Sequence, residues 1–246
     1  MITRRLYLLA LLVARGSAIV RAEDTSEVVR RSVGQDMRNE KVAKDYTYKA
    51  LNQVRDLDSS GRVKAVHSTL EEVLYIGGRD YFHLIEKDSK PLPPAEAKKE
   101  EAALDRAVRE ASAMSEAERR KREDERQARR LKNRERLRYV PNAFDFTIEG
   151  ETEISGRRKW QIRATPRRDY KGQYAFLYHN MEGTLWIDRQ DYQWVKVEAD
   201  VLNSISIGLF LARIGKGTRI SFERSKVNGE LWATNHIAMR ASGVWL

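Results

Sequence analysis

The chain has 246 residues, a formal net charge of +10 and no cysteine. The lack of cysteine excludes disulfides, thiolate metal sites and a cysteine nucleophile, and it leaves no residue to carry the acyl chains of a bacterial lipoprotein. The excess of basic residues favours anionic partners such as phospholipid headgroups, polyanions or acidic proteins.

The first residues have the layout of a secretory signal. Arg4 and Arg5 precede an apolar run at 6–13, which is too short to span a bilayer because a spanning helix needs about 20 apolar residues. Small residues near the end of this segment predict a signal peptide at 1–22, with cleavage after Ala18 as the alternative. A cytoplasmic amphipathic helix is the competing interpretation, which the paired arginines do not favour. We therefore expect an exported, soluble, periplasmic protein that is not a lipoprotein.

The mature part begins with one amphipathic helix and continues with strands. Apolar residues recur at roughly helical spacing from 25 to about 44, with Ser26 as the expected cap. From Tyr46 on, apolar and polar residues alternate, and turn chemistry at 58–61 and at 77–78 divides the alternating stretches. This pattern predicts antiparallel hairpins up to about residue 87.

Residues 94–138 are of another kind, rich in Ala, Glu, Lys and Arg. A narrow apolar stripe and the capping-box sequence that starts at Ser115 predict two helices, at about 94–113 and 115–138. Three Glu–Arg pairs four residues apart are expected to stabilise the second helix. These pairs are Glu116–Arg120, Glu118–Arg122 and Glu125–Arg129.

The second of these helices is strongly basic. Residues 115–138 contain eleven Lys or Arg against six Asp or Glu. A nucleic-acid or membrane-surface arm is one interpretation, but interleaved acidic residues are typical of a solvated helix held by its own ion pairs. Nucleic acid is not expected as a partner because the segment lacks aromatic stacking residues and an exported protein rarely meets it. We treat 94–138 as a charged helical insertion.

Strand patterns return after Pro141 and continue to the end of the chain. Phe146 and Ile148 alternate with polar residues, for example, and Asn228–Gly229 is the strongest short-range hairpin signal that a sequence offers. Some ten or eleven strands with one apolar face each must form a curved sheet that shields these apolar faces from water. The sequence therefore predicts a mainly β (α+β) fold, a curved antiparallel unclosed half-barrel plugged by the N-terminal helix. A β-sandwich that fills itself is the alternative.

No pattern isolates a catalytic or metal site. The four histidines, none of which has the spacing of a metal motif, are expected on strand surfaces; they are His67, His83, His179 and His236. Gly215-Lys216-Gly217 resembles the end of a phosphate loop, but the first glycine of that motif is missing and a β-turn explains the sequence. We expect no cofactor, no metal and no catalysis.

Two motifs in the second half of the chain are more specific. One is the strand end Trp160-x-x-x-x-Thr165-Pro166, and the other is the hairpin sequence Gly-Thr-Leu-Trp-Ile-Asp at 183–188. With Asn228–Gly229 they resemble the bacterial family of outer-membrane lipoprotein-sorting proteins related to LolA and LolB, over nearly all of residues 23–246. The resemblance implies an unclosed half-barrel whose concave side holds helices and a hydrophobic cavity for acyl chains. Because it lacks cysteine, the chain resembles the soluble LolA-like carriers rather than the LolB-like receptors.

We therefore expect a periplasmic carrier that binds the acyl chains of a lipid or lipoprotein and helps to move it toward the outer membrane. Further candidate partners are membrane-bound donor or acceptor proteins and an anionic membrane surface. A periplasmic protein-interaction module with a filled β core is the alternative, and a hydrolase is a weaker one. The residues expected to line the cavity, from their alternation on strand faces, are Tyr46, Tyr48, Phe146, Ile148, Ile162, Leu185, Ile187, Val195, Val197, Ile207, Leu209 and Phe222.

Overall fold

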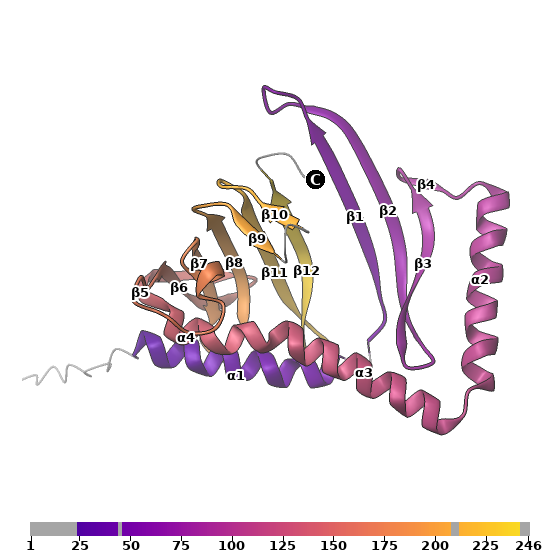
Figure 1. Ribbon diagram of the computed structural model, residues 1–246, viewed down its shortest axis with the longest axis horizontal. Coiled ribbons are helices and arrows are strands. Elements are labelled where there is room, and N and C mark those ends of the chain that lie inside the picture. Colours follow the sequence, from indigo (N-terminus) through magenta and orange to yellow (C-terminus); the bar gives the residue numbers. More distant parts are fainter. Residues whose placement is uncertain (1–23, 44–45, 208–211, 242–246) are drawn as a thin grey trace, which may run out of the picture.

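The computed structural model describes residues 24–43, 46–207 and 212–241 (Figure 1). The signal peptide predicted at 1–22 and the candidate Leu209 lie outside these residues. The described part is mainly antiparallel β structure and contains no closed barrel, which confirms the predicted half-barrel with helices. No helix in it is long and apolar enough to cross a membrane.

The described strands form three separate sheets. The first has the order β1-β2-β3-β4, the second is a six-stranded sheet of order β12-β11-β8-β7-β6-β5, and β9 and β10 form a short ribbon. The first sheet consists of β1 (Tyr48–Leu57), β2 (Val63–Ile76), β3 (Arg79–Lys87) and β4 (Lys90–Pro91). The other strands are β5 (Phe144–Ile154), β6 (Arg157–Pro166), β7 (Met181–Asp188), β8 (Trp194–Val201), β9 (Ile205–Ile207), β10 (Ala212–Ile214), β11 (Arg219–Val227) and β12 (Leu231–Arg240).

The hairpin between β11 and β12 forms where the sequence predicted it. Asn228 and Gly229 both have positive φ, 49° and 75°. They are the two central residues of the turn that the Glu230 amide closes on the Val227 carbonyl, and this turn type matches the twist of the strands. The register across this hairpin pairs Val227 with Leu231 and shifts by one residue after Glu223. The turn thus determines which β12 side chains share a face with β11.

The helix α1 (Thr25–Ala43) covers part of the concave face of the six-stranded sheet. Its apolar stripe, which includes Val28, Val29 and Val33, packs on a cluster formed by β6, β7 and β8. Its cap is not the expected Ser26: the Asp24 side chain accepts the Ser26 amide at 3.0 Å, and the Asp24 carbonyl accepts the amide of Val28. Asp24 is thus the residue that satisfies the open amides of the first turn.

The two inserted helices are α2 (Pro94–Ala113) and α3 (Glu116–Glu135), close to their predicted bounds. Ser115 and Glu118 form the reciprocal capping box that the sequence predicted. Most of α3 is exposed, as its interleaved charges predicted, but two of its arginines bind residues of other elements. Arg126 is buried and donates to Asp80 of β3 at 2.7 and 3.0 Å, and Arg134 pairs with the fully buried Asp36 of α1.

α3 therefore connects the first sheet with the helix that plugs the second sheet. It continues into a 3-10 turn, η1 (Arg136–Tyr139), and the single-turn helix α4 (Val140–Ala143) that leads into β5. Figure 1 shows α3 running beneath both sheets, beside α1, while α2 stands beside β3. No backbone pairing joins β1 to β12 in the part of the chain that the structure describes, so side chains hold the two sheets together.

Candidate ligand-binding face

One row of apolar side chains crosses the concave face of the six-stranded sheet. Strand pairing aligns Ile148 with Ile162, Ile162 with Leu185, Leu185 with Val197, Val197 with Phe222 and Phe222 with Ile237. Side chains of directly paired residues lie on the same face of a sheet. The row is covered at one end and open at the other, because Ile162 is 0% exposed beneath α1 whereas Ile237 on β12 is 71% exposed.

The neighbouring row has small side chains at its centre. It runs through Phe146, Ala164, Gly183, Ala199, Ile220 and Met239. A larger residue would not fit at Gly183, because a Cβ there would lie 2.3 Å from the carbonyl oxygen of Glu198. The backbones of β7 and β8 therefore approach closely at the centre of this row, and Met239 at its end is again exposed.

The first sheet contributes a second apolar surface. Tyr48, Val73 and Phe82 are aligned across β1, β2 and β3, and Val54 lies six residues after Tyr48 on the same face of β1. This face contacts α3 through Tyr75, whose hydroxyl donates to Glu123, and through Asp80. It is therefore the concave side, on which the helices lie.

We refer to the uncovered part of these two surfaces as the open apolar face. Its members are large apolar residues with more than half of their surface exposed, namely Tyr48, Val54, Phe82, Ile237 and Met239. Figure 1 shows β1 and β12 as neighbouring edges of the two sheets, and the Tyr46 hydroxyl, just before β1, donates to Glu230 in the β11–β12 turn. Exposed apolar patches of this kind on a folded chain mark binding surfaces.

A cleft of about 220 Å³ lies at the foot of the first sheet, where it meets α3. Its lining combines tyrosines with charged residues: Tyr46, Tyr48, Val73, Leu74, Tyr75, Asp80, Arg126 and Arg130. Burial and the hydrogen bond to Glu123 raise the pKa of Tyr75 to about 12, and the hydrogen bond to Glu230 raises the pKa of Tyr46. Both hydroxyls therefore stay protonated near neutral pH, and they can donate but not act as bases.

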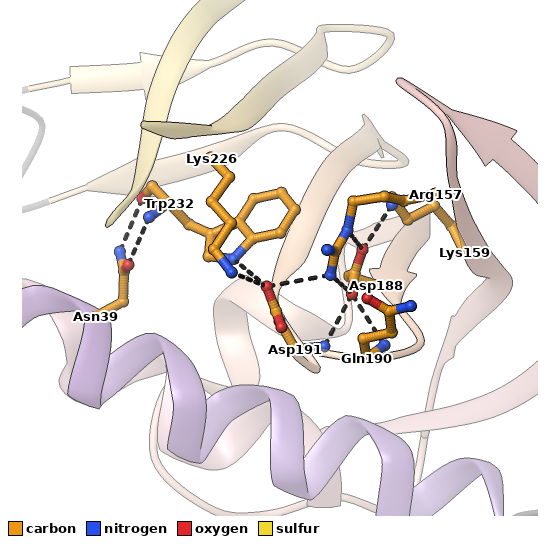
Figure 2. Close-up of polar contacts among 8 residues, drawn as sticks. All are labelled: Asn39, Arg157, Lys159, Asp188, Gln190, Asp191, Lys226 and Trp232. Atoms are coloured by element: carbon orange, nitrogen blue, oxygen red, sulfur yellow. Dashed lines mark hydrogen bonds and ion pairs between the residues drawn. The ribbon is translucent and has the colours of Figure 1, made fainter. Parts of the chain in front are cut away.

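A buried polar cluster fixes the turn between β7 and β8 (Figure 2). Asp188, at the end of β7, is fully buried and accepts hydrogen bonds from Arg157 at 2.6 and 2.7 Å and from the buried Lys159 at 2.6 Å. Burial opposes ionisation of Asp188, but these donors and the backbone amides of Gln190 and Asp191 lower its pKa far below the usual range. Asp188 thus fixes the β7–β8 turn as a permanent anion.

Two further contacts extend this cluster to β11 and β12. Asp191 accepts from Lys226 at 2.8 Å and from the indole of Trp232 at 3.0 Å. Figure 2 also shows Asn39 of α1, whose side-chain amide exchanges two hydrogen bonds of 2.8 Å with the backbone of Trp232. At the start of β12, Asn39 therefore makes the two hydrogen bonds that a neighbouring strand would make with the backbone of Trp232.

The structure brings most of the predicted cavity residues to the concave side. Five of them belong to the first row, Phe146 belongs to the second, and Ile187 is fully buried beside Trp160 and Trp194. Tyr46 and Tyr48 line the cleft. Ile207 lies on β9 and pairs with Ala212. Val195 is buried, but a bulge leaves it unpaired between β7 and β8, and Trp194 instead joins the core cluster.

Sequence reasoning missed Val54, Phe82, Ile237 and Met239 on the open apolar face. Val54 has the same parity as Tyr48, and no bulge lies between them, but Leu51 and Asn52 interrupt the alternation of apolar and polar residues. Ile237 could have been found by continuing the Asn228–Gly229 hairpin register to β12. The register shift after Glu223 changes the parity, however, and a bulge leaves no mark that periodicity can detect.

The histidines offer no metal site. His67 and His236 are exposed on β2 and β12, His83 is half-buried on β3, and His179 follows the short helix α5 (Ala175–Tyr178) rather than lying on a strand. Within the described ranges, no group of three or more His, Asp or Glu residues could hold a metal ion.

Among known proteins, the comparisons find similarity to solved structures alone. No protein-family model matches the chain, and no curated protein sequence matches it. A domain from Vibrio parahaemolyticus assigned to outer membrane lipoprotein sorting aligns at 11% identity and a TM-score of 0.33, covering 87% of this chain and 86% of that one. A DUF1329 family protein from Desulfovibrio piger aligns over the same shares at 11% identity and a TM-score of 0.30.

A chain of the Pseudomonas aeruginosa MucA/MucB complex is also similar, at 11% identity and a TM-score of 0.26, over 84% of this chain and 90% of that one. The first of the three neighbours is of the kind that the sequence motifs resembled. With every TM-score below 0.5, none of them bears on function.

Proposed function

We propose that this protein is an exported, non-enzymatic carrier that binds acyl chains of a lipid or lipoprotein on its open apolar face. The observation that carries the proposal is the row from Ile162 to Ile237, which is closed by α1 at one end and open at the other. A row that served only as core would be covered along its whole length.

The physical properties of an acyl chain fit this surface. Each methylene that leaves water contributes about 0.8 kcal/mol, and the open apolar face offers large exposed apolar side chains. The predicted signal peptide and periplasmic location belong to the same proposal, with transport toward the outer membrane as its purpose.

The test compares two exposed residues on opposite faces of β1. Val54 is 61% exposed on the concave side and Leu51 is 65% exposed on the other side. Val54→Glu should weaken binding of a fluorescent fatty acid by about tenfold or more, since a charge spoils the transfer of several methylenes. Leu51→Glu, the matched control, should leave the affinity unchanged, and both variants should keep the melting temperature.

Mass spectrometry of lipids that copurify with the protein from the periplasmic fraction gives a second readout. Acyl lipids should accompany the wild type and be depleted in Val54→Glu. Equal probe affinity for wild type and Val54→Glu, or equal losses in both variants, would reject binding on the concave face.

A protein-binding role is the second candidate, because the outer edges of β1 and β12 have no strand partner within the described residues. Such edges are templates for strand addition by an extended peptide. Added strands protect backbone amides, so hydrogen exchange at β12 separates the two functions: a peptide partner should slow exchange at its edge, whereas a bound acyl chain should not.

A further inference from the structure

A second surface, away from the open apolar face, combines aromatic and basic side chains. It forms where η1 meets the loop 167–180 between β6 and β7. The Tyr178 hydroxyl donates to the carbonyl oxygen of Arg136 at 2.6 Å, and the rings of Tyr139 and Tyr174 lie 5.8 Å apart. The amide of Arg167 also donates to the carbonyl of Ala143 at 2.9 Å, so the two segments form one surface.

We call this surface the aromatic-basic patch. Its base is a cluster of rings 5.6 to 6.3 Å apart, formed by Tyr139, Phe144, Phe146, Tyr170, Tyr174 and Tyr178. Phe176, on α5 within the loop 167–180, has 58% of its surface exposed. The same two segments carry four exposed basic residues, which are Arg136, Arg138, Arg168 and Lys171.

The acidic residues of the patch are engaged by a single arginine. Asp145 and Asp169 lie 3.7 and 3.2 Å from Arg167, and the ion pair with Arg167 lowers the pKa of Asp169. Arg167 therefore offsets both carboxylates in part, and the four exposed basic side chains leave the patch with a clear positive excess.

We propose that the aromatic-basic patch docks the protein on an anionic phospholipid bilayer. The charges are complementary, because juxtamembrane basic residues bind anionic headgroups additively. Tyrosines prefer the headgroup level, where one side of the ring is apolar and the hydroxyl is wet. An exposed phenylalanine among basic side chains is the combination by which surface-bound segments insert shallowly into a membrane.

An acidic protein partner fits the patch less well. Recognition of a folded protein needs a buried centre of complementary shape, whereas the large exposed apolar residue here is one phenylalanine on a helix of four residues. A fluid lipid surface requires no fixed geometry of the charges.

The position of the patch adds a functional consequence. Asn180 accepts the amide of Leu202 at 2.8 Å, Val201 pairs with Met181, and Asp200 of β8 pairs with Arg219, which is opposite Arg240 of β12. The patch and the exposed end of β12 with Met239 therefore lie at the same end of the six-stranded sheet. A bilayer that contacts the patch would face the open end of the acyl-binding surface, although docking itself does not depend on acyl binding.

The experiment measures partition of the purified protein onto vesicles of phosphatidylcholine with and without phosphatidylglycerol. Wild type should bind the anionic vesicles and not the neutral ones, and binding should weaken steeply as salt rises. The double variant Arg168→Glu/Lys171→Glu should lower partition by at least about 25-fold, since each basic residue near the surface is worth about fivefold.

The matched control is Arg120→Glu/Lys121→Glu on the exposed side of α3, which makes the same change in net charge. These residues precede Arg136 by about 24 Å of helix, well beyond the roughly 10 Å screening length at about 0.1 M salt. Partition should stay within about twofold of wild type. Equal losses in the two double variants would show attraction by net charge alone and overturn the proposal.

A second readout reports insertion. The chain has no cysteine, so Phe176→Cys and the control Val108→Cys each carry one environment-sensitive fluorophore. Emission should shift to the blue on anionic vesicles only for the label at position 176. Absence of that shift, or tight binding to an acidic protein with none to vesicles, would overturn the proposal. Acyl-probe affinity should be unchanged in Arg168→Glu/Lys171→Glu, so membrane docking and acyl binding can fail separately.

Discussion

At the residue scale, Ile162 and Ile237 share one row on one face of one sheet and differ only in what covers them. Ile162 lies under α1, and Ile237 lies on the edge strand β12. The two-residue side-chain period of a strand predicts which face of the sheet a residue lies on, but not whether another element covers that residue. Strand alternation could therefore predict that Ile162, Leu185 and Phe222 point to the concave side, but it could not predict which end of the row is open.

Substitution of the two isoleucines by glutamate makes this difference measurable. Ile162→Glu should unfold the protein, since an unpaired buried charge costs several kcal/mol and natural domains are stable by only about 5–15 kcal/mol. Ile237→Glu should leave the melting temperature nearly unchanged because water already reaches that side chain. Thermal melts followed by circular dichroism test both variants, and a folded Ile162→Glu variant would contradict the buried core described for α1.

Asp188 determines how the stability depends on acid. Its pKa is lowered in the folded state, so its contribution is fully present above about pH 5 and is lost progressively as pH falls through the unfolded value near 3.9 toward the folded pKa. Asp188→Asn leaves Lys159 without its anion and Arg157 with Asp191 alone, 3.1 Å away, which costs about 3–5 kcal/mol, or roughly 10 °C, at neutral pH. The deficit relative to wild type should shrink in acid.

The control for this prediction is Asp145→Asn, at a carboxylate that is 76% exposed and 3.7 Å from Arg167. Its melting curve should follow that of wild type from neutral pH down to acid. A constant deficit of Asp188→Asn at all pH values would show that Asp188 is not ionised in the folded protein.

At the element scale, α3 is the connector between the two sheets. The sequence predicted its boundaries well, because a capping box and a helical pattern are local signals. The ion-pair partners of α3 in other elements could not be predicted from i,i+4 spacing. Arg126 and Arg134 bind Asp80 and Asp36, which precede them by 46 and 98 residues, and no local pattern reports contacts of that separation.

Truncation of Arg126 tests the connecting role of α3. Arg126→Ala should lower the free energy of unfolding by about 1–3 kcal/mol, less than for a fully buried pair because Asp80 is 43% exposed. Hydrogen exchange in β3 should accelerate at the same time. Arg120→Ala, at an exposed position of the same helix, should change stability by no more than about 0.5 kcal/mol. Equal effects of the two substitutions would mean that α3 does not hold the first sheet.

At the scale of the whole molecule, the sequence predicted an unclosed antiparallel half-barrel with helices on its concave side, and the structure has one. It did not predict that the strands divide into separate sheets, since whether β1 pairs with β12 depends on backbone groups that every residue carries. Alternation therefore predicts strands far better than it predicts which strands are neighbours.

This division gives the two walls of the binding surface unequal stiffness. The six-stranded sheet is cross-linked by continuous backbone hydrogen bonds and filled by the cluster under α1, and such close-packed cores resist deformation. The first sheet is attached through side chains such as Arg126, Glu123 and Tyr46, which can tilt while they keep their partners. The first sheet can therefore tilt as a unit without repacking of the core under α1, and under the proposed acyl-binding function this would let the open apolar face fit chains of different thickness.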